Sequence, residues 1–340
     1  MTAAPRHILI IGAGSVGRRH AKNLQMLGCH VSCMDPRPDR LEQAGRELSI
    51  KHQFGNLEAA LSHAGEFSGV AVCSPPIFHV QQTQAALDRG LPILLEKPAS
   101  VNAASCRPLQ AGLARGGRVL LGYTYRWWPP IQRMKTLLED GTIGPLRHAR
   151  FIMSAHLADW HPWERYQDFF MASRELGGGA LLDESHFIDL MLWFFGMPER
   201  IYARVEHVSD LDITTDDLVD MVALYPNRFR VTMHLDLFGR PHDKQIVVTG
   251  EKGTIQCLFN PDSVRIGRMP QSSWETEKFS IERNDMFLAV AREFLDMIDG
   301  RRSDPTCTVT DGLKALEVVD ACRKSQATGA EVSLAEACRD

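Results

Sequence analysis

The sequence lacks the long apolar segment that a membrane-spanning helix requires. No apolar run approaches the roughly 18 residues needed to cross a bilayer, and the opening segment, MTAAPRHILIIGAG, has too few apolar residues for a signal peptide. A run rich in Lys and Arg is also missing, and 38 basic and 42 acidic residues leave a net charge of -4. We therefore expect neither a membrane nor a nucleic acid as a partner.

Cysteines at the spacing of redox or metal motifs are missing as well. None of the eight cysteines belongs to a C-x-x-C pair. Cys29, Cys33, Cys73 and Cys257 lie in apolar segments, which is typical of small core residues in a reducing cytoplasm. A disulfide framework is therefore not expected, and we expect the protein to be cytoplasmic.

The chain does have the length and composition of a folded protein with two domains. Its 340 residues exceed what a single ordinary core organises. Hydrophobic residues make up 44% and charged residues 24%, which is typical of globular proteins. No internal repeat or low-complexity linker is visible, so composition alone does not mark the boundary.

The first motif is a glycine-rich turn between an expected strand and an expected helix. An apolar strand is predicted over residues 7–11, and Gly12, Gly14 and Gly17 follow it in G-x-G-x-x-G spacing. A helical pattern comes next, and then a second strand that ends at Asp35. The glycines permit a tight turn, the approach of a pyrophosphate and close helix packing. The helix start supplies N–H groups to the phosphates, so a dinucleotide site is favoured over a purely structural turn.

Asp35 bears on the choice of dinucleotide. An acid at the end of the second strand can accept hydrogen bonds from the adenosine ribose and would repel a 2'-phosphate, which favours NAD. Arg37 and Arg40 follow closely, and an Arg there can hold a 2'-phosphate. NADP therefore stays possible.

Strands continue to alternate with helices as far as the segment PILLEKP. This alternation predicts a doubly wound parallel sheet, whose ligands bind beyond the carboxyl ends of its strands. Ser74 and the turn formed by Glu96, Lys97 and Pro98 lie at such ends. A lysine directly after a buried strand is costly unless it has a role, so Lys97 is predicted at the mouth of the cofactor site.

Several motifs together resemble one family. The segments GAGSVG, CSPPIFH, EKP and GYTYRWWP, and later ELGGGALLDESHFIDLMLWFFG, resemble the Gfo/Idh/MocA oxidoreductases over essentially the whole chain. The resemblance implies an N-terminal Rossmann domain and a C-terminal α/β domain with a large, mostly antiparallel open sheet. It places these domains at residues 1–124 and 125–340, with the last helix possibly packed on the first domain. It further implies substrate binding and oligomerisation by the second domain, as a homodimer or homotetramer.

The resemblance also implies roles for individual residues. Lys97 is the expected catalytic or substrate-positioning lysine, its bond to Pro98 is often cis, and Asp183 and His186 complete the catalytic set. The expected cofactor-binding residues are Gly12, Gly14, Ser15, Val16, Gly17, Asp35, Ser74, His79, Glu96, Lys97 and Arg126. The expected substrate-binding residues are Lys97, Arg126, His156, Trp160, Tyr166, Asp183 and His186.

The segment after the glycine run departs from the commonest family pattern. Asp183 and His186 are three residues apart rather than four, and Asp189 follows three residues later. Residues three apart on one helix share a face, so either acid could support the histidine. His186 could take up the hydroxyl proton of an alcohol, whereas Asp189 is expected to be a structural partner.

An aromatic segment, HLADWHPWERYQDF, is predicted to form a loop over the site. Trp160, Tyr166 and the histidines His156 and His161 could stack on a sugar or bind its hydroxyls. A metal held by histidines of this loop together with Asp183 and His186 is not expected, because the spacing suits no ligand set. Trp127 and Trp128 are predicted to pack at the domain crossing.

The remaining chain alternates apolar and polar residues from residue 199 onward and closes with two amphipathic helices. The alternation predicts antiparallel strands with one solvated face. Together these features predict an NAD(P)-dependent oxidoreductase acting on a secondary alcohol or carbonyl of a sugar, polyol or nucleotide-sugar. The alternatives are an NAD-dependent hydrolase or lyase that oxidises a sugar transiently, and a non-catalytic NAD-binding sensor.

Overall fold

The computed structural model describes residues 5–160, 164–270 and 273–337. The chain divides into two compact units. The first comprises Met1–Thr124 and Arg283–Leu313, and the second comprises Tyr125–Glu282 and Lys314–Asp340. None of the helices within the described residues combines the length and apolar character that a bilayer crossing needs.

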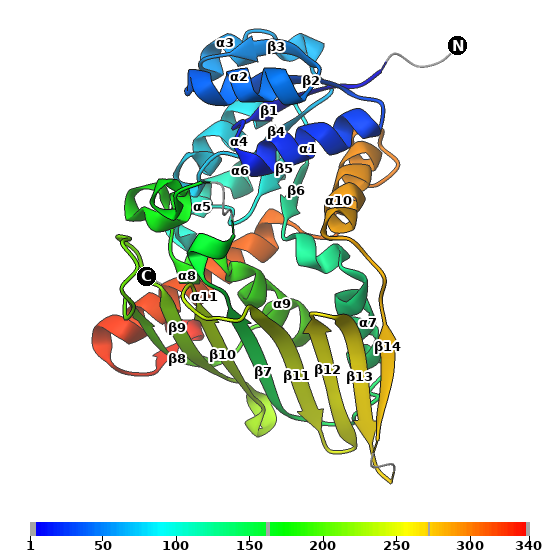
Figure 1. Cartoon of the computed structure of the whole chain (residues 1–340), viewed down its shortest axis with the longest axis vertical. Helices are drawn as coiled ribbons and strands as arrows, with labels where there is room; N and C mark the ends of the chain where they lie inside the picture. Colours follow the sequence, from blue (N-terminus) through cyan, green and yellow to red (C-terminus); the bar gives the residue numbers. More distant parts are fainter. Residues whose placement is uncertain (1–4, 161–163, 271–272, 338–340) are drawn as a thin grey trace. The chain divides into compact units, whose positions relative to one another are not determined.

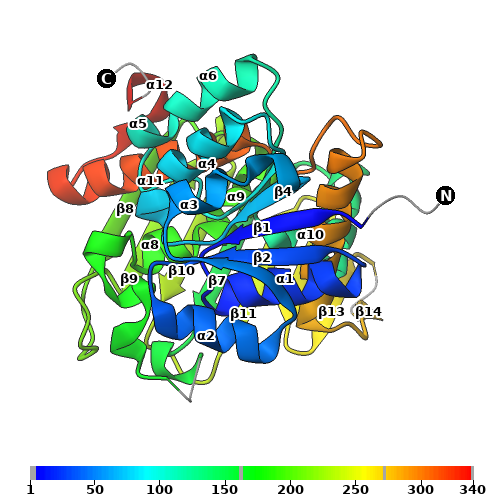
Figure 2. The same cartoon turned by 90° about the horizontal axis from the view of Figure 1, so that it is seen from above.

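The first unit contains a six-stranded parallel sheet with the order β3-β2-β1-β4-β5-β6 (Figure 1). Its strands are β1 (His7–Ile11), β2 (His30–Met34), β3 (Ile50–Phe54), β4 (Gly69–Val72), β5 (Ile93–Glu96) and β6 (Val119–Gly122). Its helices are α1 (Ser15–Met26), α2 (Pro38–Glu47), α3 (Leu57–Leu61), α4 (His79–Leu87), α5 (Ala103–Cys106), α6 (Pro108–Ala114) and α10 (Arg283–Ile298). Figure 2 shows β1 and β2 beside α1.

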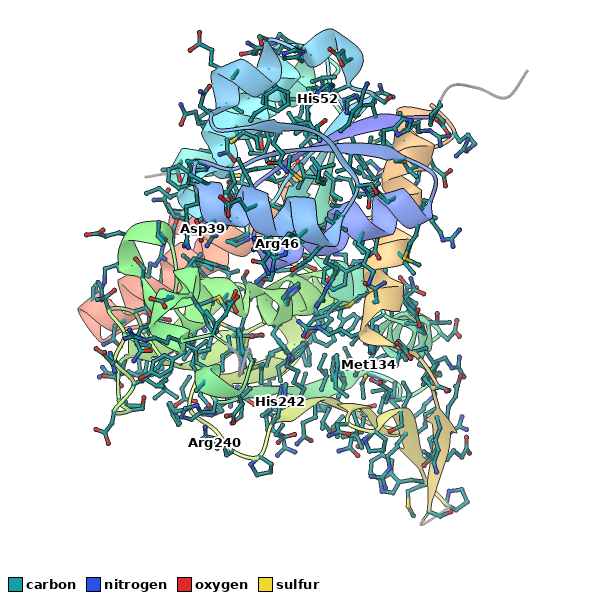
Figure 3. All side chains as sticks on the ribbon, turned by 45° about the horizontal axis from the view of Figure 1, so that its top comes forward. Asp39, Arg46, His52, Met134, Arg240 and His242 are labelled. Atoms are coloured by element: carbon teal, nitrogen blue, oxygen red, sulfur yellow. The ribbon has the colours of Figure 1, made fainter. Side chains whose placement is uncertain are left out.

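The strands other than the edge strand β3 are mostly apolar because helices cover both faces of the sheet. Every residue of β1, β4, β5 and β6 is buried, whereas the edge strand β3 alternates between half-buried and exposed positions. The outer helix α2 buries only Ala44, and its Asp39 and Arg46 are exposed (Figure 3).

The strand order reverses between β1 and β4, which places the cofactor loops together. The chain leaves β1 toward β2 on one side and returns to β4 on the other. Ligands bind at such a switch point, beyond the carboxyl ends of the strands. A Cβ on Gly12 would lie 2.7 Å from the backbone of Cys73 and Ser74, so the loops after β1 and β4 touch there.

Helix α10 belongs to the first unit, whereas the sequence pattern predicts residues from 125 onward in the second domain. The physical reason is its apolar face, which needs a partner. Gly69 in β4 has no side chain, and a Cβ there would lie 2.9 Å from both Phe294 and Ile298. The ring of Phe287 also meets the ring of His20 on α1, with 5.6 Å between centroids.

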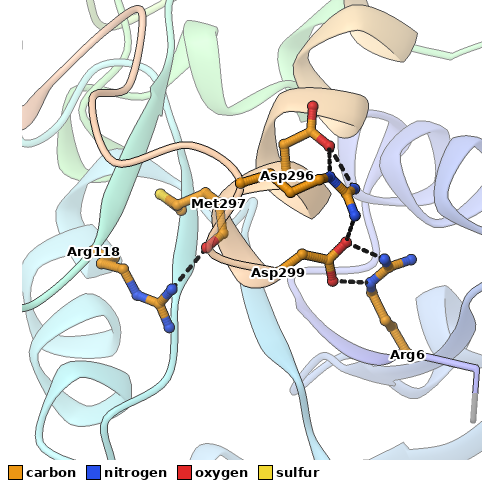
Figure 4. Close-up of polar contacts among 6 residues, drawn as sticks. Arg6, Arg118, Asp296, Met297 and Asp299 are labelled. Carbon is orange, nitrogen blue, oxygen red and sulfur yellow. Dashed lines mark hydrogen bonds and ion pairs between the residues drawn. The ribbon is translucent and has the colours of Figure 1, made fainter. Parts of the chain in front are cut away.

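Ion pairs fix the end of α10 to the start of the sheet (Figure 4). Arg6, just before β1, pairs with Asp299, and Arg301 pairs with Asp296 and Asp299. Arg118, before β6, donates to the carbonyl of Met297 at 2.7 Å. These exposed pairs add specificity to a contact whose stability comes from apolar burial.

The second unit contains a nine-stranded sheet with the order β14-β13-β12-β11-β7-β10-β9-β8-β15. Only the pair β7 and β10 is parallel among the ladders of this sheet within the described residues. The strands are β7 (Leu146–Ser154), β8 (Arg200–Glu206), β9 (Leu218–Leu224), β10 (Arg230–Asp236), β11 (Asp243–Gly250), β12 (Gly253–Phe259), β13 (Asp262–Arg268), β14 (Trp274–Lys278) and β15 (Val332–Ser333). The predicted fold class, a Rossmann domain followed by a domain with a large and mostly antiparallel sheet, is confirmed.

Helices lie on one face of this sheet: α7 (Pro129–Glu139), α8 (Ala180–Asp183), α9 (Ser185–Phe195), α12 (Leu334–Ala337) and the second-unit part of α11 (Val309–Thr328). On β10, Val231, Met233 and Leu235 are buried, and the residues between them are not. Phe187 of α9 meets Phe151 of β7 edge-on, at 6.4 Å between ring centroids. The alternation of buried and less buried residues along β10 therefore reflects a sheet with one face packed against helices and one face without helices.

The packing of α10 gives a first prediction. Phe294→Ala should lower the free energy of unfolding of the first unit by about 3–5 kcal/mol, because it removes a fully buried ring from a packed contact. Urea denaturation followed by circular dichroism measures this change. Arg301→Ala, which removes only ion pairs at the surface, with Asp296 and Asp299, is the control and should change it by less than about 1 kcal/mol. A loss from Phe294→Ala no larger than that of the control would show that α10 does not stabilise the unit.

Candidate active site

The glycine loop has the backbone geometry of a phosphate cradle. Gly12 has a φ of +95°, and a Cβ on Gly17 would lie 1.9 Å from the carbonyl oxygen of Gly12. Gly14 is different, because a Cβ there would meet only Arg40, at 3.8 Å. Thus Gly12 and Gly17 are needed for the fold, whereas Gly14 leaves the loop open to a ligand.

The start of α1 is suited to an anion. Gly14 occupies the N-cap position without a capping side chain, and the first turn, which contains Ser15, Val16 and Gly17, has no acidic residue. The N–H groups of such a turn, at the positive end of the helix dipole, are available to phosphate oxygens. The residues present therefore fit the pyrophosphate of a dinucleotide.

Asp35 is fixed beside this loop. Its Oδ2 accepts a hydrogen bond from the N–H of Ala13 at 2.8 Å, and its Oδ1 accepts one from the N–H of Arg37 at 2.9 Å. Arg40 Nη1 lies 3.8 Å from Oδ2. The Arg37 guanidinium pairs with Asp39 at 2.6 Å. The carboxylate thus retains lone pairs for ribose hydroxyls, and the arginine nearest to it is Arg40.

His79 and Ser74 lie where the loop after β4 leads into α4. The Ser74 hydroxyl donates to Gln82 at 2.5 Å. The His79 ring is fully buried, with Nδ1 2.7 Å from the carbonyl oxygen of Pro98 and Nε2 2.7 Å from that of Ser74. Both ring nitrogens therefore face the chain itself, so His79 is placed to hold the cofactor loops rather than to contact a ligand directly.

The turn after β5 is built around a buried carboxylate. Glu96 Oε1 lies 2.7 Å from Nε2 of His20, and Oε2 accepts a hydrogen bond from the N–H of Lys97 at 3.2 Å. A Cβ on Gly122 would come within 3.2 Å of this carboxyl group, so a side chain there would force the carboxyl group to shift. Lys97 is half-buried, and its bond to Pro98 is cis.

His20 is a site residue that the sequence pattern did not reveal. It falls among the apolar positions of α1, a pattern that predicts only a packed helix face. The usable signal was chemical, because a fully buried imidazole needs a polar partner. The nearest sequence clue was Glu96, a buried acid that needs a partner as well.

In the second unit, a glycine run leads into the segment that carries His186. A Cβ on Gly178 would lie 2.3 Å from the carbonyl oxygen of Met171, and Gly179 has a φ of +108°. Asp216 then caps the next helix, because its Oδ2 accepts a hydrogen bond from the N–H of Leu181 at 2.8 Å. Burial raises the pKa of this carboxyl group, and the Leu181 hydrogen bond opposes that rise.

The prediction of one continuous helix after the glycines is wrong. α8 ends at Asp183, and α9 begins at Ser185. Glu184 between them has non-helical angles, and the hydroxyl of Ser185 donates to the carbonyl of Leu182 at 2.7 Å. This break means that the spacing of three residues from Asp183 to His186 does not place them on one helix face.

Asp189 is bound by Arg126 rather than left to support His186. Arg126 Nη2 and Nε donate to its two oxygens at 2.7 and 2.9 Å, and both side chains are at most 4% exposed. Arg126 also lies over the ring of Trp193, 5.5 Å from its centroid. The predicted direct contact of Arg126 with cofactor or substrate stays a prediction, and its guanidinium fork already has a structural partner.

Tyr125 is a second residue that the motifs did not single out. Its ring lies 4.6 Å from the half-buried ring of His186, centroid to centroid. Its hydroxyl accepts a hydrogen bond from Lys244 Nζ at 2.9 Å. The Tyr125 ring therefore lies between the Lys244 ammonium and His186, the predicted proton acceptor.

The aromatic loop is held by its own polar contacts. His156 Nδ1 accepts a hydrogen bond from the N–H of Ala158 at 3.2 Å, and Asp159 pairs with Arg240 at 2.7 Å. Trp160 is half-buried, and no hydrogen-bond partner for its Nε1 occurs among the described residues.

The hydroxyl of Tyr166 accepts a hydrogen bond from the N–H of Asp212 at 3.2 Å, and His161 lies outside the described residues. Trp127 and Trp128 are buried, as a packing role predicts. No group of three potential metal ligands occurs within the described part of the chain.

Comparison with known proteins connects both units to one family. Residues 6–124 match the model of an oxidoreductase family with an NAD-binding Rossmann fold, and residues 131–256 match the GFO/IDH/MocA C-terminal domain. The chain belongs to the GFO/IDH/MocA oxidoreductase family. The predictions of an oxidoreductase with an NAD-binding Rossmann domain are thereby confirmed.

Individual relatives are distant but match along the chain. The inositol 2-dehydrogenase of Pseudomonas savastanoi pv. phaseolicola is 27% identical, over 96% of this chain and 96% of that protein. The D-glucoside 3-dehydrogenase of Escherichia coli is 26% identical, over 58% and 56%. The structure of levoglucosan dehydrogenase with NADH has a TM-score of 0.86 at 16% identity, covering 97% of this chain and 99% of that one.

The pair of Arg126 and Asp189 gives a second prediction. Arg126→Met should lower the free energy of unfolding by about 3–5 kcal/mol, because it leaves the Asp189 carboxylate buried without its cation. The double variant with Asp189→Leu should recover most of that loss. Urea denaturation followed by tryptophan fluorescence measures both.

A matched arginine controls for the substitution itself. Arg133 forms an exposed pair with Glu277, so Arg133→Met should change the free energy by less than about 1 kcal/mol. If Arg126→Met lowers the free energy of unfolding no more than Arg133→Met does, the buried pair does not stabilise the second unit.

Proposed function

We propose that this enzyme transfers hydride between NAD and a secondary alcohol or carbonyl of a sugar, polyol or nucleotide-sugar. The observation that carries the proposal is Lys97, a half-buried lysine fixed at the carboxyl end of β5 in the NAD-binding domain. Relatives named for inositol and D-glucoside dehydrogenation support a polyhydroxylated substrate.

Bound NAD would supply the hydride acceptor, and the chain would position it. The open backbone at Gly14 and the start of α1 would hold the pyrophosphate, and Asp35 would bind the adenosine ribose. Ser15 and Val16 would contribute backbone N–H groups. Ser74 would contact the cofactor from the loop after β4. Glu96 and His79 would support the loops that bind the cofactor.

The proton of the reacting hydroxyl needs an acceptor while the alcohol is oxidised. Lys97 would donate a hydrogen bond to the reacting oxygen, and His186 would take up the proton. We assign Asp183, which ends α8, to orient His186 across the break at Glu184, since Asp189 binds Arg126. Tyr125 would fix the imidazole plane by packing. In carbonyl reduction the same groups would return the proton.

The second unit would provide the substrate contacts. His156, Trp160 and Tyr166 belong to the aromatic loop, whose rings and hydrogen-bonding atoms suit sugar faces and hydroxyls. We assign Arg126 a supporting role, in which it holds α9 through Asp189. The predicted homodimer or homotetramer stays a prediction.

Two alternatives predict different chemistry. A hydrolase or lyase that oxidises its sugar transiently would turn over substrate without net NADH formation, and a sensor would bind NAD without turnover. Absorbance of NADH together with detection of product, during incubation with a panel of inositols, glucosides and nucleotide-sugars, separates the three. Net NADH formation supports the proposal, whereas product formation without it favours the hydrolase or lyase.

A third prediction concerns the choice of cofactor. NADH should bind at least about tenfold more tightly than NADPH, a difference of about 1.4 kcal/mol, because Asp35 repels a 2'-phosphate. Asp35→Asn keeps the shape of the side chain and removes its charge, so it should reduce the ratio of the NADPH to the NADH dissociation constant. The exposed control Asp39→Asn should leave this ratio unchanged. Fluorescence titration gives the dissociation constants. Equal binding of the two cofactors by the wild-type protein would contradict this and point to Arg40 as a phosphate ligand.

A fourth prediction concerns the proton-transfer residues. Lys97→Ala and His186→Ala should each lower kcat by about 10²–10⁴-fold and leave the NADH dissociation constant nearly unchanged. If both groups act as one proton-relay unit, the double variant should be little slower than the slower single variant. Lys22→Ala, on the exposed face of α1, is the matched control.

The outcomes of these variants separate the roles. A nearly normal kcat in His186→Ala would remove that residue from proton transfer and move the assignment to Asp183. Lost NADH binding in Lys97→Ala would mean that the turn after β5 is chiefly a cofactor clamp.

A further inference from the structure

His79 is a fully buried histidine that proton transfer as proposed does not use. It begins α4, and its ring lies between two loops of the cofactor edge. Nδ1 lies 2.7 Å from the carbonyl oxygen of Pro98, in the turn after β5. Nε2 lies 2.7 Å from the carbonyl oxygen of Ser74, in the loop after β4.

The two partners of this ring can only accept hydrogen bonds. A carbonyl oxygen has no proton to give, whereas a neutral imidazole donates from one nitrogen and presents a lone pair at the other. A neutral His79 would therefore direct a lone pair at one of the two oxygens at a short distance. Only the imidazolium form, with a proton on each nitrogen, satisfies both contacts.

Other forces act on the ring in both directions. Burial is the largest influence and leaves the pKa of His79 below its ordinary value, and the charge of Lys97 lowers it further. The hydrogen bonds to Pro98 and Ser74 and the charge of Glu96 act in the opposite direction. The start of α4 also disfavours a cation. The geometry decides between them, because a neutral ring would lose one of two short hydrogen bonds in a site with no exposure to water.

A cation at His79 would also help to compensate the buried Glu96 carboxylate, on which the charge of Arg19 acts as well. That carboxylate is 8% exposed, and an ion so placed requires compensation. His20 donates to it, but Nδ1 of His20 is buried and has no hydrogen-bond partner among the described residues. His20 thus fits the neutral tautomer with its proton on Nε2, which supplies a hydrogen bond without a charge.

We propose that His79 is held as a buried imidazolium that donates to both carbonyls, balances the Glu96 carboxylate and fixes the turn that carries Lys97. His79 is then a positioning residue, since both of its ring nitrogens are bound to carbonyl oxygens of the chain. The charged groups that act on it are Glu96 and Lys97.

The effect on Lys97 rests on the proposed function. A fixed positive charge near an ammonium makes the ammonium release its proton more readily, which lowers the pKa of the lysine. His79→Gln removes that charge, so the pKa of Lys97 should rise. The limb of the kcat pH profile that reflects ionisation of Lys97 should then move to higher pH by about one unit. The direction is the same whether the lysine works as an acid or as a base.

Neutron diffraction from deuterated crystals of the full chain with NADH tests the charge without any variant. Deuterium on both Nδ1 and Nε2 of His79, and on Nε2 alone of His20, is the expected result. Deuterium on only one nitrogen of His79 would overturn the proposal.

Kinetics of His79→Gln test the consequence. The expected result is a lower kcat and a pH limb moved to higher pH, with no such shift in His30→Gln, an exposed histidine at the start of β2. An unchanged limb of the kcat pH profile would overturn the proposed effect of the His79 charge on Lys97. Should His79→Gln fail to fold, the neutron result still decides the charge.

Failure of the proposed function would look different from failure of this proposal. Normal kcat in Lys97→Ala would remove Lys97 from proton transfer while leaving the doubly protonated His79 in place. A singly protonated His79 beside an inactive Lys97→Ala would refute the imidazolium and retain the proposed function.

Discussion

The close approach of backbone to backbone at the carboxyl edge of the parallel sheet is the constraint on which the cofactor site depends. A Cβ on Gly17 would lie 1.9 Å from the carbonyl oxygen of Gly12, and one on Gly12 would meet the loop after β4. No side chain fits at either position, so α1 packs tightly and its start faces the ligand edge. The open position at Gly14, the uncapped start of α1 and the fixed Asp35 follow from that approach.

The same edge contains an unusual concentration of buried polar groups. Glu96 and His20 meet at 2.7 Å beneath the turn that presents Lys97, and His79 ties that turn to the loop after β4. Buried polar groups of this kind are stable only when each finds a partner. A network that joins α1, β5 and α4 can hold one lysine in place more firmly than a loop could.

The second unit places its functional groups differently. The glycine run forces a close turn, Asp216 caps α8, and a break at Glu184 starts the helix that carries His186. The buried pair of Arg126 and Asp189 then holds α9. Here the fold separates acids that the sequence presents together, because the break at Glu184 puts Asp183 and His186 on different helices and Asp189 binds Arg126.

The sequence by itself determined the Rossmann motif, both sheet types and the position of Lys97, because glycine spacing, apolar runs and alternation are local patterns. The strand β7 and the return of α10 to the first unit depended on tertiary packing. An amphipathic pattern predicts an apolar face but not the element against which that face will pack. The partners of His20, His79 and Asp189 were also decided there. A buried polar side chain pairs with whatever group the fold brings near, and Glu96 lies 76 residues from His20 along the chain.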